Sequence, residues 1–318
     1  MKKCSFCGNT LHSNVTKEHI IPAGLLKLFP EQDITFAPHK AYKDNIGITL
    51  KDVCSTCNNH ILGSLDAYGV NLIKDNFIRQ FKMDESYTIS FDYNQLSRWL
   101  LKIIYNYERY MKVDYTTHTN IQYILYSSNI EHQFSIFAGL HSNMNLVGEE
   151  NNFYRPLFIT NNLKFYPNGL IDIGAFTHIG KIKKDNGQEC NFKILNDAFL
   201  IKFASIKFLI LFWKDTASEK EISVHNSLIE TVFPYKYIDN DNDITLNRVN
   251  SHFDNYHPTV ICGNVGLDSA DSILKSLIPD YLTVQEYFRN FVATNPLSQE
   301  LKQQMENDIL NRYNHQKQ

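Results

Sequence analysis

The chain has little that would place it in or across a membrane. Its most apolar stretch, residues 199–213, contains Lys202 and Lys207. It is also shorter than the roughly 20 residues that a membrane-spanning helix needs. Met1 is followed by two lysines and a polar stretch, without the apolar run of a signal peptide. These absences predict a cytoplasmic protein without a membrane span, and residues 199–213 are expected to form a buried bent strand or hairpin.

The sequence also has no excess of positive charge. Its 31 lysines and arginines are outnumbered by 34 aspartates and glutamates, so the net charge is −3. This balance excludes a globally basic, histone-like binder of nucleic acid, and any such site must be a local patch. The sequence has no internal repeat, no Walker-type phosphate loop and no Rossmann glycine fingerprint, so it gives no signal for the common nucleotide-binding classes.

The chain does have enough apolar residues for a large core. Hydrophobic residues make up 43% and charged residues 20% of it, which excludes disordered and low-complexity classes. A length of 318 residues favours two domains. Apolar residues recur at helical spacing in 94–111, and a helix is also expected after Cys57. Further strands are expected at 121–127, 134–140, 154–160, 170–178 and 192–195, and two C-terminal helices at 284–293 and 299–313.

Four of the six cysteines form two Cys-x-x-Cys pairs, Cys4 with Cys7 and Cys54 with Cys57. Two such pairs supply the four thiolates that complete a tetrahedral structural zinc site. A disulfide framework is a poor alternative in a chain without an export signal. A redox pair would need a single motif that opens a helix in a βαβ unit, and neither pair is placed that way. We therefore predict that these four cysteines bind a structural Zn²⁺ ion.

Glu18 and His19 are adjacent between the two cysteine pairs and are followed by Ile20, Ile21 and Pro22. Such a pair alone is typical of a protein surface. The three motifs taken together, Cys4-x2-Cys7, Glu18-His19-Ile20-Ile21-Pro22 and Cys54-x2-Cys57-Asn58-Asn59, resemble the HNH endonuclease family. This family is the zinc-supported branch of the His-Me finger nucleases, and the motifs occur here in its order. The resemblance covers residues 1–75.

The resemblance implies a ββα-metal fold in which zinc holds the ends of a hairpin and a helix. It implies that His19 is the general base, since a neutral imidazole can accept a proton from water. Glu18 and Asn58 would hold a catalytic divalent ion, Mg²⁺ or Mn²⁺, through oxygen atoms. Asn59 or His60 could take the place of Asn58. Because neighbouring strand residues face opposite sides, His19 and Glu18 can serve one site only if the strand ends or twists there.

The sequence departs from the family pattern in the loop before the second cysteine pair. An asparagine that braces the histidine loop is expected there, whereas this chain has Thr49, with Asn45 earlier in the sequence. Asp66 is expected to be a helix-surface carboxylate, with a contact to the metal as the alternative.

Several basic residues could contact phosphate groups or could simply be solvated. In the N-terminal region these are Lys17, Lys40, Lys43 and Lys51. Arg98, Lys102 and Arg109 are expected on the polar side of the helix at 94–111, where they would extend such a track or keep the helix soluble.

We predict an α+β protein with a small zinc-bound ββα-metal (HNH) domain, 1–80, and a larger strand-rich domain with C-terminal helices, 81–318. The predicted function is metal-dependent hydrolysis of phosphodiester bonds, in DNA more than RNA, with restriction or phage defence as the role by analogy. Residues 81–318 would choose the target, sense a ligand or regulate activity, and could mediate a homo-oligomer or bind a protein partner. Two alternatives stay open: a non-catalytic zinc ribbon that binds nucleic acid or protein, and a sensor domain whose nuclease output acts on RNA.

Overall fold

The structure is a computed structural model that describes residues 2–11, 15–28, 34–37, 40–43, 48–79, 81, 85–112, 120–128, 130, 133–140, 159–160, 163–164, 171–176, 181–183, 189–191, 193–232, 235–239 and 242–248. The helices predicted at 284–293 and 299–313 lie outside the described residues, as does most of the strand predicted at 154–160.

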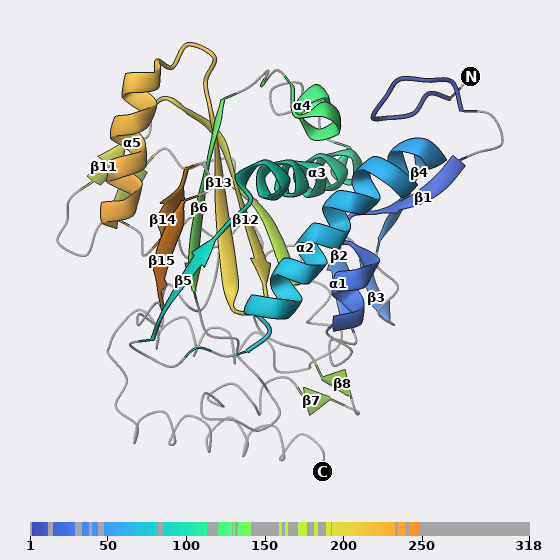
Figure 1. The fold of residues 1–318 in the computed structure, drawn as a ribbon, viewed down its shortest axis with the longest axis horizontal. Helices are drawn as coiled ribbons and strands as arrows, with labels where there is room; N and C mark the ends of the chain where they lie inside the picture. Colours follow the sequence, from blue (N-terminus) through green and yellow to red (C-terminus); the bar gives the residue numbers. More distant parts are fainter. Residues whose placement is uncertain are drawn as a thin grey trace.

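The N-terminal part is built on two antiparallel strands, β1 and β4, and the helix that follows them (Figure 1). That helix begins with a π-helical turn, η1, and continues as α2. It confirms the helix predicted after Cys57. The segment between α1 and β4 contains the antiparallel pair of β2 and β3. The elements are β1 (Val15–His19), α1 (Ala23–Leu28), β2 (Ile34–Ala37), β3 (Lys40–Lys43), β4 (Thr49–Cys54), η1 (Cys57–Leu62) and α2 (Gly63–Asn76).

The larger part is organised around a five-stranded antiparallel sheet in the order β14-β6-β13-β12-β9. Helices and sheets are both well represented, which agrees with the predicted α+β class. The elements are β5 (Ser86–Ser90), α3 (Tyr93–Met111), α4 (Ile121–Tyr126), β6 (Phe134–Leu140), β7 (Ile159–Thr160), β8 (Leu163–Lys164), β9 (Ile171–Phe176), β10 (Lys181–Lys183), β11 (Glu189–Asn191), β12 (Leu195–Phe203), β13 (Ile206–Trp213), α5 (Glu219–Val232), β14 (Lys236–Ile238) and β15 (Asp243–Asn247).

The apolar stretch 199–213 forms most of the hairpin of β12 and β13 at the centre of this sheet, as predicted. Every residue of β13 is buried, because both faces of the sheet are covered. On one face Phe203 packs on Trp99 of α3, with the ring centres 5.1 Å apart. On the other face Trp213 belongs to a cluster that includes Ile229 of α5. Figure 1 shows α3 and α5 on opposite sides of the sheet.

Helix α3 matches the helix predicted at 94–111. Asp92 caps its N-terminus by accepting a hydrogen bond from the Gln95 backbone N–H at 2.9 Å. Its apolar stripe, which includes Leu96, Leu100 and Ile103, is buried. The helix therefore has a covered side against the sheet, and other side chains of the same helix contact α4 and the N-terminal part of the chain.

The prediction of a strand at 121–127 is wrong, because residues 121–126 form the short helix α4. The last carbonyl groups of a helix lack partners within the helix. Here the Arg98 guanidinium donates to the Ile124 carbonyl at 2.9 Å and the Leu125 carbonyl at 3.1 Å. The helix ends at Ser127, whose φ of 57° is left-handed. A contact from α3 thus stabilises a helix in a segment whose β-branched and aromatic residues favour a strand.

One cluster of buried apolar side chains runs through both parts of the chain. It includes Cys4, Phe6 and Leu65 from the N-terminal part and Phe199 and Phe212 from the sheet. The division at residue 80 stays a prediction, and this core is continuous across it. No helix in the described part of the chain combines the length and the apolar character needed to cross a membrane.

Candidate functional site

The first cysteine pair lies in a tight loop at the start of the chain. The Cys4 N–H donates to the Asn9 carbonyl at 2.8 Å, and the Gly8 N–H donates to the Cys4 carbonyl at 2.9 Å. Gly8 has a φ of 73°, in the left-handed region that favours glycine. Gly8, which follows Cys7, therefore allows the chain to turn back so that the thiols of Cys4 and Cys7 lie close together.

The second pair lies where β4 passes into η1, and it meets the first pair. The Cys54 N–H approaches Cys4 Sγ at 3.4 Å, and the Cys57 N–H approaches Cys54 Sγ at 3.4 Å. All four sulfur atoms lie within 4.8 Å of one another, and Cys7 Sγ is 3.8 Å from Cys54 Sγ. Sulfur atoms bound to a tetrahedral zinc ion are also about 3.8 Å apart, given a Zn–S distance of ~2.3 Å. None of the four cysteines is in a disulfide.

The electrostatics of the four thiols favour a bound cation. Burial raises the pKa of Cys4, but the N–H groups of Cys54, Cys7 and Phe6 outweigh it and lower the pKa to about 7. Burial and the neighbouring sulfur atoms raise the pKa of Cys57. Four adjacent thiolates would repel one another, and a divalent ion removes that repulsion. The cluster could therefore hold a metal ion, and its geometry and donor set fit a structural Zn²⁺ ion.

His19 is the last residue of β1, where the strand runs against β4. The next residue, Ile20, donates its N–H to the Ile48 carbonyl at 3.0 Å. Glu18 is buried, with 2% of its surface exposed, whereas His19 is partly exposed. The two side chains therefore face different sides of the strand, as alternation requires. Burial lowers the pKa of His19, Glu18 raises it, and Lys102 and Lys17 lower it, so that it lies below its ordinary value of 6.5.

Asn58 lies beside β1, on the first turn of η1. Its side-chain Nδ2 donates to Thr16 Oγ1 at 2.8 Å and to the Lys17 carbonyl at 3.1 Å. Asn59 and His60 are exposed. Of the three residues considered from the sequence at this position, Asn58 is thus the one in contact with the strand that carries His19.

Glu18 is not an open carboxylate, as its predicted role as an ion ligand would require. Lys102 Nζ of α3 lies 2.6 Å from Glu18 Oε1, and Asn106 Nδ2 donates to the same oxygen at 3.0 Å. Lys102 Nζ also lies 2.7 Å from both carboxylate oxygens of Asp66 on α2. Burial favours the neutral amine, but the carboxylates of Asp66 and Glu18 outweigh it and raise the pKa of Lys102.

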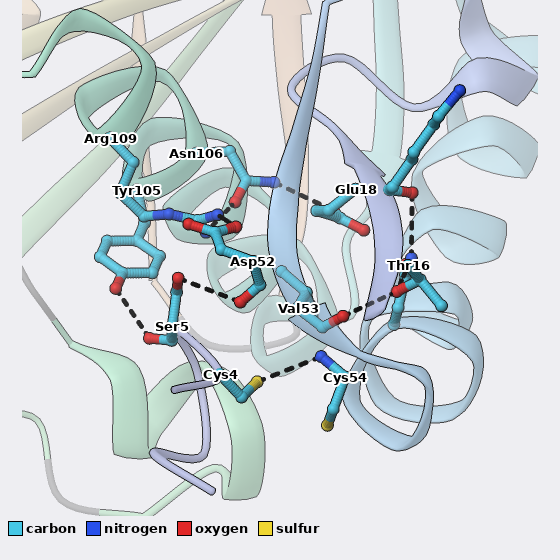
Figure 2. Close-up of polar contacts among 12 residues, drawn as sticks. Cys4, Ser5, Thr16, Glu18, Asp52, Val53, Cys54, Tyr105, Asn106 and Arg109 are labelled. Atoms are coloured by element: carbon cyan, nitrogen blue, oxygen red, sulfur yellow. Dashed lines mark hydrogen bonds and ion pairs between the residues drawn. The ribbon is translucent and has the colours of Figure 1, made fainter. Parts of the chain in front are cut away.

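Helix α3 makes further contacts with the cysteine loop and with β4 (Figure 2). The Tyr105 hydroxyl donates to the Ser5 carbonyl at 2.8 Å. The Arg109 guanidinium pairs with Asp52 on β4 and donates to Asn106 Oδ1 at 2.9 Å. Asn106 Nδ2 also donates to the His19 carbonyl at 3.1 Å. One face of α3 therefore holds the first cysteine loop, β4 and the end of β1.

These contacts correct several predictions about basic and acidic residues. Lys102 and Arg109 point into the protein rather than along a phosphate track or into solvent, and the partly buried Arg98 binds the end of α4. Lys102 has no exposed surface, and the Arg109 side chain is 13% exposed. Asp66 is not a solvated surface carboxylate, because it pairs with Lys102. Thr49, which stands where the family pattern has a bracing asparagine, pairs with His19 in the β1–β4 ladder, while Asn45 lies outside the described residues.

The structure also adds Asn106, which sequence analysis did not single out. Lys102, Asn106 and Arg109 follow one another at helical spacing, so a polar stripe beside the apolar one was visible in the sequence. Its burial was not visible, because that depends on which elements cover it.

The divalent catalytic ion fits this arrangement poorly. A cation on Glu18 would lie close to the Lys102 ammonium, which already compensates that carboxylate. Among the described residues, the four cysteines form the one group of three or more His, Cys, Asp or Glu side chains close enough to share an ion.

Comparison of the chain with protein-family models, with curated proteins and with solved structures gave no match.

Proposed function

We propose that this chain is an endonuclease that hydrolyses phosphodiester bonds in DNA, with His19 as the general base. The observation that carries the proposal is the environment of His19, a partly exposed imidazole at the end of a strand that pairs with the zinc-site strand β4. Its lowered pKa keeps the ring neutral near pH 7, which is the form that accepts a proton from water. Lys17 and Lys51, both exposed on β1 and β4, supply local positive charge for a phosphate backbone.

The zinc ion would have a structural role in this proposal. With four thiolate ligands it has no open position for water or substrate, so it would fix the loop, β4 and η1 rather than take part in the reaction. The Mg²⁺ or Mn²⁺ ion implied by the resemblance stays a prediction. A part in restriction or phage defence rests on the resemblance alone.

The test is cleavage of supercoiled plasmid, linear duplex DNA, single-stranded DNA and RNA, each with Mg²⁺, with Mn²⁺ and with EDTA. His19→Ala is expected to lower the rate by about 10²–10⁴-fold, because a positioned base contributes roughly that much. His225→Ala is the control, since it removes a partly exposed imidazole from α5, on the other side of the sheet from α3. Equal cleavage by wild type and His19→Ala would refute the role of His19. Cleavage of RNA alone would show that the substrate is RNA rather than DNA.

The commitment of Glu18 to Lys102 favours a second candidate, a non-catalytic zinc-supported module that binds nucleic acid. That candidate predicts binding of labelled duplex without cleavage under every metal condition. His19→Ala would then leave the binding affinity within twofold of wild type, whereas replacing Lys17 and Lys51 together would weaken it.

A further inference from the structure

We propose that Asn106 and Lys102 of α3 are positioning residues, which hold the end of β1 so that the His19 imidazole faces the substrate. The inference rests on the proposed nuclease function. It concerns residues far along the chain from the motif that carries the resemblance.

The first observation is that Asn106 is completely buried and that its amide has a defined orientation. Its Nδ2 donates to Glu18 Oε1 at 3.0 Å and to the His19 carbonyl at 3.1 Å, while its Oδ1 accepts from Arg109 at 2.9 Å. A flipped amide would place its oxygen against two acceptors and its nitrogen against a guanidinium donor. The contact to the His19 carbonyl is therefore specific to a side-chain amide in this orientation.

The second observation is that Lys102 joins three elements through one buried ammonium group. Its Nζ contacts Glu18 of β1 at 2.6 Å and Asp66 of α2 at 2.7 Å. Hydrogen bonds between charged groups are stronger than neutral ones, so the Glu18 side chain has little freedom to turn away from α3.

The two contacts act on His19 through the geometry of the strand. Side chains of neighbouring strand residues project to opposite faces. When Glu18 is held against α3 and the His19 carbonyl is held by Asn106, the imidazole must project away from α3. A free strand end would sample other orientations, and a displacement of about 1 Å in a reacting group can cost roughly a hundredfold in rate.

The experiment compares full-length Asn106→Leu, which removes the amide at similar volume, with Asn106→Gln, which keeps both N–H donors. We expect kcat of Asn106→Leu to fall roughly tenfold to a hundredfold with KM within twofold, and Asn106→Gln to recover part of that loss. Ser97→Ala is the control, because Ser97 is equally buried on α3 and bonds to Tyr93 and Tyr123 instead. Its kcat should match wild type.

A second readout does not depend on activity. The backbone ¹³C carbonyl resonance of His19 reports its hydrogen bond, and it should shift in Asn106→Leu and stay near wild type in Ser97→Ala. If wild type cuts no nucleic acid, the proposed function fails while this resonance still tests the contact. If Asn106→Leu does not fold, Asn106→Ser replaces it with the same readouts. A folded variant without the amide that keeps both kcat and the His19 carbonyl resonance would overturn the inference.

Discussion

At the scale of single residues, the most demanding feature is the Lys102 ammonium, which sits without exposed surface between two carboxylates. Transferring a charge into the interior is costly, and partners at short distance offset that cost. Glu18 and Asp66 come from β1 and α2, so the compensation exists only when α3, β1 and α2 are assembled. The polar residue that periodicity alone places on the outside of α3 is therefore part of the interior.

Lys102→Met should destabilise the protein by about 3–5 kcal/mol, because the buried Glu18 and the partly buried Asp66 lose their counter-ion. Urea unfolding measures this loss. Lys74→Met, at an exposed position on α2, is the control and should change stability by less than about 0.5 kcal/mol. The double variant with Glu18→Gln should recover part of the loss, and no recovery would show that Lys102 acts by packing alone.

The pair also has a pH dependence of defined sign. The folded-state pKa of Lys102 is raised, so its contribution is complete below the unfolded pKa of ~10.4 and is lost as pH rises through the folded value. The stability difference between wild type and Lys102→Met should therefore shrink at strongly alkaline pH.

At the scale of secondary-structure elements, the approach of α2 and α3 depends on one glycine. A Cβ built on Gly69 would lie 2.0 Å from Cε2 of the buried Trp99 indole. The indole ring and the backbones of α2 and α3 cannot shift far enough to relieve this overlap unless the two helices move apart. Since Trp99 also stacks near Phe203, the same glycine sets the distance from α2 to the sheet.

Gly69→Ala should cost about 1–3 kcal/mol or more, although alanine is the better helix former. Thermal unfolding is the measurement. Gly63→Ala on the same helix is the matched control, because its Cβ would meet only the Asn58 carbonyl, at 3.2 Å. Equal melting temperatures for the two variants would contradict the assigned role of Gly69.

The elements also show which parts of the fold could be predicted from the sequence. Helix α3 has apolar residues at helical spacing and the β12–β13 hairpin has a continuous apolar run. Both elements were predicted, because these patterns lie within the elements themselves. Helix α4 was missed, because the Arg98 contact with its C-terminal carbonyls comes from a distant residue. In the candidate site, the cysteine cluster followed from spacing, whereas the partners of Glu18 did not, since Lys102 and Asn106 belong to a helix that no local pattern connects to it.

At the scale of the whole molecule, the cysteine cluster ties the start of the chain to the β4–η1 junction, and α3 contacts the same cysteine loop and β4 through Tyr105 and Arg109.

Metal analysis of purified protein should find about one zinc ion per chain. Cys54→Ser should lower zinc content and the thermal stability of the N-terminal part, because ligand loss weakens both binding and folding. Cys262→Ser is the control and should retain zinc. Full zinc content in Cys54→Ser would show that Cys54 is not a zinc ligand.

The burial of β13 on both faces has a consequence for synthesis on the ribosome. Helices α2 and α3, which cover one face, are made before the strand, whereas α5, which covers the other, is made just after it. Because synthesis proceeds at roughly 5–20 residues per second, the second face of the sheet is uncovered for only a few seconds before α5 has been made. During that interval the apolar hairpin is a hazard for association between nascent chains. The order of elements along the gene thus limits the time for which the most aggregation-prone segment is uncovered.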